Sequence, residues 1–284
     1  MILQLNLISG CDIFRTFNEQ FLIMYNFDQE NDQTPRMLII SVIVTAVLFL
    51  VFFYSPSPND PQPEQVVELP DFSRIEDIKQ RKEAFFSFLR PIVQKLNLEI
   101  RNDRNRLIEL AKEYSSDGQF KRANEGFLSD LSNKYRLDMS DFENKLSMID
   151  ELKLRVQVIP ESLVLAQAAN ESSWGRSRFA REGNNLFGQW CFKPGCGLIP
   201  KSRPEGKQYE VAVFDSPVES VWSYMLNLNS FAAYESFRER RRSLLRNNEK
   251  LLGATLAEEL INYSTRREEY VKEIQTMIRQ NSLE

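Results

Sequence analysis

The chain has 284 residues, enough for one or two domains, with 42% hydrophobic and 27% charged residues and a formal net charge of −4 at neutral pH. This weakly acidic balance lacks the basic excess typical of nucleic-acid binding. The sequence contains no histidine, which excludes Ser-His-Asp and Cys-His nucleophile systems and HExxH zinc sites. Acid–base chemistry is therefore left to carboxylates, tyrosines and lysines.

An apolar segment lies near the N-terminus. Residues 37–54 (MLIISVIVTAVLFLVFFY) are uncharged and mostly apolar, and as a helix they span roughly 27 Å, about the thickness of a bilayer core. Arg15 and Arg36 precede this segment, whereas no basic residue follows it before Arg74. The alternative, a cleaved signal peptide, lacks a small-x-small cleavage site. The sequence therefore predicts a cytoplasmic segment over 1–36, a single-pass inner-membrane anchor and a periplasmic remainder.

A linker and a helical region are expected after the anchor. Residues 55–72 contain five prolines and four acidic residues, which indicates an extended tether. From 73 to 155, apolar residues recur at three-, four- and seven-residue steps among charges, the pattern of amphipathic helices. Pro91 is expected to kink the first helix or divide it in two. We interpret 73–155 as a helical accessory region.

The remaining residues, 156–284, have an α+β pattern that is mostly helical. Residues 204–207 (PEGK) predict a turn between two short strands. Residues 216–219 (SPVE) form a capping box that is expected to start a helix, and residues 265–268 (TRRE) are expected to start the last helix in the same way. The fold class predicted is therefore helices with one small hairpin-like region.

One carboxylate lies at the end of a predicted helix, VLAQAANESSWG (164–175), between Pro160 and Gly175. Glu171 is on its last turn, where the helix dipole disfavours a negative charge. We expect this dipole, the alanine-rich approach and Trp174 to raise the pKa of Glu171, as a general acid at neutral pH requires. The alternative is a surface glutamate on a frayed helix end.

Two motifs resemble a known family. ESSWG (171–175) matches the E-S-x-W-G signature of the bacterial peptidoglycan glucosaminidases of glycoside hydrolase family 73, and NNLFG (184–188) resembles their N-L-F-G motif. The segment 176–196 is similar to the bacterial Bax-type members. The resemblance covers about half of the chain and implies a lysozyme-like fold in which Glu171 is the general acid.

The resemblance also implies further catalytic residues. The second carboxylate of the family is assigned to Glu205, with Glu210 as the alternative. Tyr263 corresponds to the family's functional tyrosine, whose phenol would bind the acetamido group of the substrate or position water; the alternative is a ring in the core. Neither a metal nor an organic cofactor is implied.

Several residues are candidates for substrate binding, although core packing is the alternative for aromatic side chains. They are Trp174, Asn185, Phe187, Trp190 and Tyr234. Cys191 and Cys196 are expected to form a local disulfide if the domain is exported, with free thiols as the alternative. The arginines between residues 238 and 246 are interpreted as a solvated helix face, with contact to anionic wall polymer or lipid headgroups as the alternative.

These observations predict a membrane-anchored hydrolase that cleaves β-1,4 bonds after N-acetylglucosamine in peptidoglycan strands. One alternative is a lytic transglycosylase, which also relies on a single glutamate. Another is a non-catalytic peptidoglycan-binding protein on the same fold.

Overall fold

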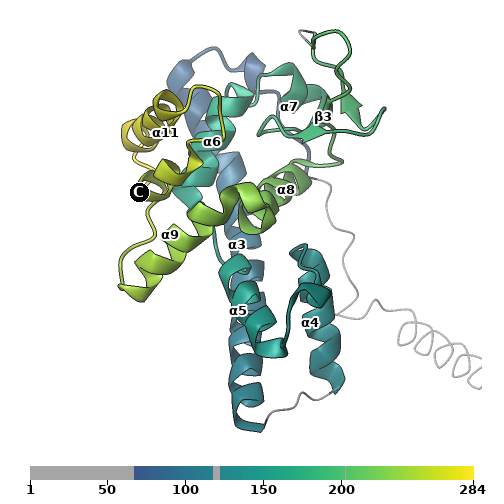
Figure 1. Cartoon of the computed structure of the whole chain (residues 1–284). Coiled ribbons are helices and arrows are strands. Elements are labelled where there is room, and N and C mark those ends of the chain that lie inside the picture. The colour runs from purple at the N-terminus through teal and green to yellow at the C-terminus, as the bar shows by residue number, and fades with distance from the viewer. Residues whose placement is uncertain (1–66, 118–121, 202) are drawn as a thin grey trace, which may run out of the picture. The chain divides into compact units, whose positions relative to one another are not determined.

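The computed structural model describes residues 67–117, 122–201 and 203–284, all of which belong to one compact unit (Figure 1). The expected cytoplasmic segment, the anchor over 37–54 and the linker up to residue 66 lie outside the described residues. Among the described residues, no helix is long and apolar enough to cross a membrane. The division into an accessory region and a glucosaminidase domain at residue 156 stays a prediction.

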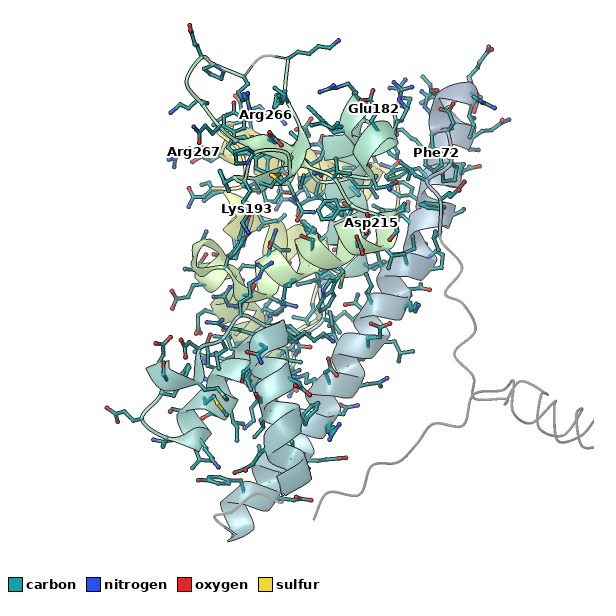
Figure 2. The ribbon with its side chains drawn as sticks, turned by 90° about the vertical axis from the view of Figure 1, so that its right-hand side faces the viewer. Phe72, Glu182, Lys193, Asp215, Arg266 and Arg267 are labelled. Carbon is teal, nitrogen blue, oxygen red and sulfur yellow. A yellow bond between two sulfur atoms is a disulfide. The ribbon has the colours of Figure 1, made fainter. Side chains whose placement is uncertain are left out.

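A single long helix, α3 (Ile78–Asp117), runs along one side of the unit, as Figure 2 shows, where Phe72 marks the chain just before its N-terminal end. Its buried face carries apolar side chains at helical spacing, namely Phe85, Leu89, Val93, Leu96, Ile100 and Leu107. This face packs on α5 (Lys145–Arg155), α6 (Glu161–Ser172) and α8 (Pro217–Ser230). The long helix therefore supports both ends of the unit.

The expected division of this helix at Pro91 was wrong, because α3 continues through the proline. A proline inside a helix removes one backbone hydrogen bond and costs about 3 kcal/mol. Leu89 and Val93 on either side of it are fully buried, and each such side chain contributes roughly 1.5–3 kcal/mol when it leaves water. Burial along the whole face therefore outweighs the local penalty.

The other helical elements are shorter. In chain order they are η1 (Phe72–Arg74), α4 (Arg122–Lys134), η2 (Met139–Asp141), α7 (Arg178–Gly183), η3 (Ala232–Tyr234), α9 (Glu235–Arg246), α10 (Gly253–Leu256), η4 (Ala257–Leu260) and α11 (Glu268–Gln280). The helix α6 is central: α3, α10 and α11 pack around it, and its side chains from Ser162 to Ala169 are buried (Figure 1).

A small antiparallel sheet completes the fold. Its strands are β1 (Trp190–Cys191), β2 (Gly197–Leu198) and β3 (Glu210–Ala212), in the order β1-β3-β2. Trp190 pairs with Val211, and Leu198 pairs with the same residue from the other side. The predicted turn over 204–207 lies between β2 and β3. The structure thus confirms a mostly helical α+β fold with one small hairpin region.

The two predicted capping boxes differ in outcome. The hydroxyl of Ser216 accepts a hydrogen bond from the amide of Glu219 at 3.3 Å and starts α8 as expected. The last helix begins at Glu268 without a side-chain cap, so the prediction that residue 265 caps it was wrong. Ser264 accepts from the amide of Arg266 through its hydroxyl and from that of Arg267 through its carbonyl, which closes a separate turn before the helix.

Candidate active site

Glu171 lies on the last turn of α6, half-buried in the middle of the fold. Burial raises the pKa of its carboxyl group, while hydrogen bonds from the side chains of Tyr270 and Asn170 and the positive charge of Arg266 act in the opposite direction. The net effect is a raised pKa, because loss of hydration disfavours the charged form more than these partners favour it. A carboxylic acid in this position is suited to proton donation.

The end of α6 has an unusual backbone. The helix ends at Ser172, and Ser173, Trp174 and Gly175 follow with φ of 53°, 61° and 75°. The helix therefore stops before Gly175, which is the third residue in a left-handed run. The hydroxyl of Ser172 holds this turn by accepting a hydrogen bond from the amide of Gly175 at 2.8 Å.

Trp174 contacts the long helix. Its ring packs edge-on against Phe85 and Phe86 of α3, with centroid distances of 5.9 and 5.1 Å, and the Lys82 ammonium lies 4.9 Å from the ring centroid. These contacts attach the end of α6 to α3. They give Trp174 a structural explanation that does not involve a glycan groove.

The structure brings the two sequence motifs together. Gly188, the last residue of NNLFG, has φ of +65°, and a Cβ atom added to it would lie 3.9 Å from Oε2 of Glu171. The turn that contains Gly188 therefore borders the carboxyl group. The ESSWG and NNLFG motifs, which occur in the same order as in the family, therefore lie next to each other in the folded protein.

A buried chain of hydrogen bonds ends at the acid. The hydroxyl of Tyr224 donates to Oε1 of Gln167, and Nε2 of Gln167 donates to the hydroxyl of Tyr270 at 2.8 Å. Since the hydroxyl oxygen of Tyr270 accepts from Gln167, its single hydrogen is available for the hydrogen bond with Glu171. This chain holds the carboxyl group in one orientation.

Tyr263 contacts both Tyr270, the hydrogen-bond partner of Glu171, and Phe187 of the NNLFG motif. Its hydroxyl donates to the carbonyl of Phe187 at 3.1 Å, and its ring stacks on that of Tyr270 with a centroid distance of 5.4 Å. The negative charge of Glu171 contributes to raising its pKa, after burial and the neighbouring tyrosines Tyr270 and Tyr224. Tyr263 thus belongs to the same cluster of side chains as Tyr270, the hydrogen-bond partner of Glu171.

Two residues of the second motif are structural. Phe187 is 2% exposed and stacks on Tyr224 at 4.0 Å, so its ring belongs to the core. Asn185 is 1% exposed, and its amide nitrogen donates to the carbonyls of Gln189 and Ala212. Asn185 therefore ties the turn to β3, and neither side chain presents a free surface to a sugar.

One exposed aromatic residue, Trp190, lies on the sheet. Trp190 is 58% exposed and stacks on Tyr209 with a centroid distance of 4.5 Å and an interplanar angle of 14°. An exposed indole that stacks flat on a second, half-buried ring is suited to contact with the apolar face of a sugar. Tyr234 is half-buried, with its ring centroid 6.4 Å from that of Tyr263.

The candidates for a second carboxylate differ in their surroundings. Glu205 is exposed in the turn between β2 and β3. Glu210 is 6% exposed, and its two oxygens accept hydrogen bonds from the amides of Gly195 and Gly197 at 3.1 and 2.8 Å. These bonds hold the pKa of Glu210 below its ordinary value. Its carboxylate therefore fastens the adjacent loop.

The same loop is closed by a disulfide between Cys191 and Cys196, whose Cα atoms are 6.2 Å apart. These two cysteines and Glu210 form the one cluster of metal-ligand types found in the described part of the chain. Because the two sulfurs are bonded to each other, they offer no thiolates and the cluster does not fit a metal ion.

The prediction from sequence missed Tyr270 and Arg266, which act on the acid directly, and Gln167, which donates a hydrogen bond to Tyr270. One signal was present for Gln167, which precedes Glu171 by four residues and is a lone polar residue in an otherwise apolar turn, so both side chains share a helix face. Nothing local identifies Tyr270, which lies on another helix. Glu273, also on α11, is close enough that its charge helps to raise the pKa of Glu171.

Comparisons with known proteins agree with the motifs. Residues 146–283 match the family model described as Glucosaminidase, mannosyl-glycoprotein endo-beta-N-acetylglucosaminidase. Protein bax of Escherichia coli (strain K12) is 35% identical over 213 residues, which are 75% of this chain and 74% of that protein. The catalytic domain of the autolysin Auto from Listeria monocytogenes matches 61% of this chain and 94% of its own at 22% identity, with a TM-score of 0.35 that is too low to establish a common fold. The chain belongs to the glucosaminidase family of glycoside hydrolases.

Proposed function

We propose that this protein hydrolyses the β-1,4 bond after N-acetylglucosamine in peptidoglycan strands, on a lysozyme-like fold, with Glu171 as the general acid. The observation that carries the proposal is the half-buried carboxyl group with a raised pKa, bordered by Gly188. Family membership supports the type of bond, and the E-S-x-W-G and N-L-F-G motifs support peptidoglycan as the substrate.

In the first step, Glu171 donates its proton to the glycosidic oxygen, and the bond between this oxygen and the anomeric carbon breaks while the acetamido oxygen of the substrate forms a bond to that carbon. The leaving sugar departs with a free hydroxyl group. In the second step, the resulting carboxylate of Glu171 accepts a proton from the water that attacks the anomeric carbon and displaces the acetamido oxygen from it. The hydrogen bond from Tyr270 stabilises the carboxylate that exists between the two steps.

The nucleophile in this proposal is the acetamido oxygen of the substrate itself. Neither Glu205, which is exposed, nor Glu210, which is bonded to two backbone amides, has surroundings that favour attack or water activation beside Glu171. Substrate-assisted cleavage needs only one protein carboxyl group and gives a product that retains the β configuration. A freshly formed α anomer, detected by proton NMR, would contradict this route.

Tyr263 is proposed to position the acetamido group. Since its hydroxyl hydrogen is donated to the carbonyl of Phe187, its oxygen lone pairs are available to accept the N–H of the substrate. Such a bond would turn the acetamido oxygen towards the anomeric carbon.

We expect Tyr263→Phe to lower turnover about 10- to 100-fold, because it removes an orienting hydrogen bond. The unfolding free energy should change by only about 1 kcal/mol, the net contribution of one hydrogen bond. Tyr135→Phe is the matched control, since Tyr135 is buried and its hydroxyl has no partner among the described residues. Equal activity of both variants in a reducing-end assay would remove Tyr263 from the mechanism.

Product analysis tests the proposed hydrolysis and distinguishes it from lytic transglycosylase activity and from binding without catalysis. Purified protein is incubated with peptidoglycan, and the released fragments are analysed by mass spectrometry. Hydrolysis after N-acetylglucosamine gives reducing N-acetylglucosamine ends. Anhydro-muramic ends would instead identify a lytic transglycosylase, and binding to peptidoglycan without any soluble fragment would identify a non-catalytic protein.

We further propose that the domain works in the periplasm, anchored to the inner membrane through 37–54. The disulfide between Cys191 and Cys196 supports an oxidising compartment. Recovery of the protein in the soluble cytoplasmic fraction, protected from protease in spheroplasts, would contradict this location.

A further inference from the structure

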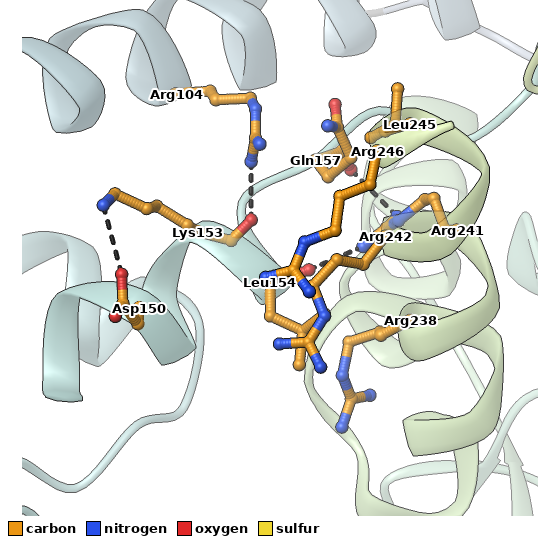
Figure 3. Close-up of a pocket in the computed structure, with 10 residues that line it drawn as sticks. All are labelled: Arg104, Asp150, Lys153, Leu154, Gln157, Arg238, Arg241, Arg242, Leu245 and Arg246. Atoms are coloured by element: carbon orange, nitrogen blue, oxygen red, sulfur yellow. Dashed lines mark hydrogen bonds and ion pairs between the residues drawn. The ribbon is translucent and has the colours of Figure 1, made fainter. Parts of the chain in front are cut away.

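A basic cavity lies between α5 and α9 and is lined by a residue of α3 as well. Its volume is about 340 Å³, and Figure 3 shows the lining side chains, which come from the three helices and, for Gln157, from the segment after α5. Six of them are cationic, namely Arg104, Lys153, Arg238, Arg241, Arg242 and Arg246. Asp150 is the one carboxylate in the lining. This excess of positive charge is unexpected in a chain with a net charge of −4.

Arg241 is a buried cation without a carboxylate partner. It is 1% exposed, and its guanidinium donates to the carbonyls of Leu154, Gln157 and Val158 and to Oδ1 of Asn229. Burial, together with the charges of Arg238 and Arg104, lowers its pKa to about 9. Neutral acceptors thus satisfy its hydrogens but leave its charge uncompensated.

Arg238 is also buried, at 3% exposed. Its Nη1 donates to the carbonyls of Leu228 and Phe231, but its Nε–H has no hydrogen-bond partner. Three carboxylates influence its charge from outside the cavity lining, namely Glu151, Glu235 and Glu239, whereas Arg155 opposes them. A buried donor that is left unpaired is rare in folded proteins and destabilising, so this atom indicates a missing acceptor.

The remaining cations differ in how they are paired. Lys153 contacts Asp150 at 3.1 Å, and Arg242 forms an ion pair with Glu239. Among the described residues, Arg104 donates to the carbonyls of Lys153 and Val156. Arg246 is exposed and has no ion-pair partner in the part of the chain that the structure describes. The cavity therefore offers both buried and accessible positive charge.

From the sequence, we interpret the arginines between residues 238 and 246 as a solvated helix face. This interpretation was wrong for Arg238 and Arg241, which are buried. Both side chains point into the protein: Arg238 donates to carbonyls at the end of α8, and Arg241 donates to carbonyls at and just after the end of α5. Buried arginines are normally paired with acids, since an isolated charge is costly to remove from water. Two buried guanidinium groups side by side repel each other unless an anion lies between or beside them.

We propose that this cavity binds a phosphate group carried by a small molecule or by a lipid headgroup. Guanidinium N–H groups match the oxygens of phosphate, and donors from three helices suit a tetrahedral anion better than a planar carboxylate. The anion would accept from Nε of Arg238 and compensate the charges of Arg241 and Arg246. The volume is within the range of small-ligand sites. The site shares no residue with the surroundings of Glu171 described above.

Titration calorimetry on the full chain tests the proposal, with sodium phosphate as the probe and sodium chloride at the same ionic strength as the reference. We expect one phosphate per chain, and at least tenfold weaker binding in the double variant Lys153→Gln/Arg246→Gln. Arg238→Lys keeps the charge but removes the Nε–H group, and it should weaken binding several-fold. The control is Arg240→Gln, which loses the same charge from α9 outside the cavity and should change binding less than twofold.

Two outcomes would overturn the proposal. The first is heat from phosphate that does not exceed heat from chloride; the second is equal weakening by the cavity variants and by Arg240→Gln, which would mean general surface attraction. Circular dichroism confirms that each variant is folded. A further titration with soluble dihexanoyl phosphatidylglycerol distinguishes the sources: tighter binding than inorganic phosphate supports a lipid headgroup, and weaker binding supports a soluble phosphate.

Discussion

Glutamine in place of Glu171 is expected to reduce the release of reducing ends from peptidoglycan by about 10³-fold, within the range for loss of a general acid. The amide has nearly the same shape as the carboxyl group and still accepts the hydrogen bond from Tyr270, but it has no acidic proton to transfer to the glycosidic oxygen. Substrate binding should be kept, so the loss should be in kcat. The control is Glu182→Gln on the exposed surface of α7, which should keep full activity.

The same replacement should make the protein more stable at neutral pH. Because the folded-state pKa of Glu171 is raised above its usual value of 4.5, the folded protein holds more protons than the unfolded chain between these two values. The free energy of unfolding therefore falls as the pH rises through that interval. Above the interval, the whole penalty of burying the ionised carboxylate is present. We expect Glu171→Gln to remove this penalty and to raise the unfolding free energy at pH 7 by on the order of 1 kcal/mol.

Urea unfolding at two pH values checks this expectation. The difference between wild type and Glu171→Gln should be present at pH 7 and disappear below about pH 4, where the carboxyl group is protonated in both states. An inactive variant that is also more stable cannot owe its inactivity to misfolding. If the variant were equally stable at pH 7, burial would not be acting on the ionisation of this residue.

Alanine in place of Gly175 is expected to destabilise the protein by about 3 kcal/mol. Two costs combine: Gly175 has φ of +75°, which strains any residue with a Cβ atom, and the added atom would lie 2.5 Å from Cδ2 of Phe72. Phe72 cannot move away easily, because it is buried and packs edge-on against Phe85 at 5.4 Å. The effect should be visible as a lower midpoint in urea unfolding.

The matched control is Gly126→Ala. Gly126 lies in α4, and a Cβ atom added to it meets no atom within 4 Å. Alanine is the better helix former, so this variant should be as stable as wild type or more stable by up to about 1 kcal/mol. Equal destabilisation by both variants would show that the contact with Phe72 is not responsible.

The Gly175 variant also tests how the acid is held in place. Trp174 and Gly175 attach the end of α6 to α3 and η1, and Glu171 lies one turn earlier on the same helix. Below its unfolding transition, Gly175→Ala should therefore show reduced turnover in addition to reduced stability. The region before residue 146 would then contribute to catalysis although it lies outside the family match.

The sequence by itself was sufficient for those features that depend on residue type and local spacing. The lack of histidine excluded whole classes of mechanism, the periodicity over 73–155 predicted helices, and the SPVE box predicted the start of α8. The spacing of ESSWG and NNLFG identified the family, which the comparisons confirmed. Such features are readable because each depends on residues only a few positions apart.

Tertiary structure alone decided which neighbours cover each residue. Pro91 stays in a continuous helix, and Trp174 packs on α3, because buried surface from distant segments outweighs local preferences. The acid's hydrogen-bond partner Tyr270 and the burial of Arg238 and Arg241 depend on helices that are far apart in the sequence. Periodicity shows which face of a helix is apolar or charged, but the free energy of burial depends on what packs against that face, and this is set by the whole fold.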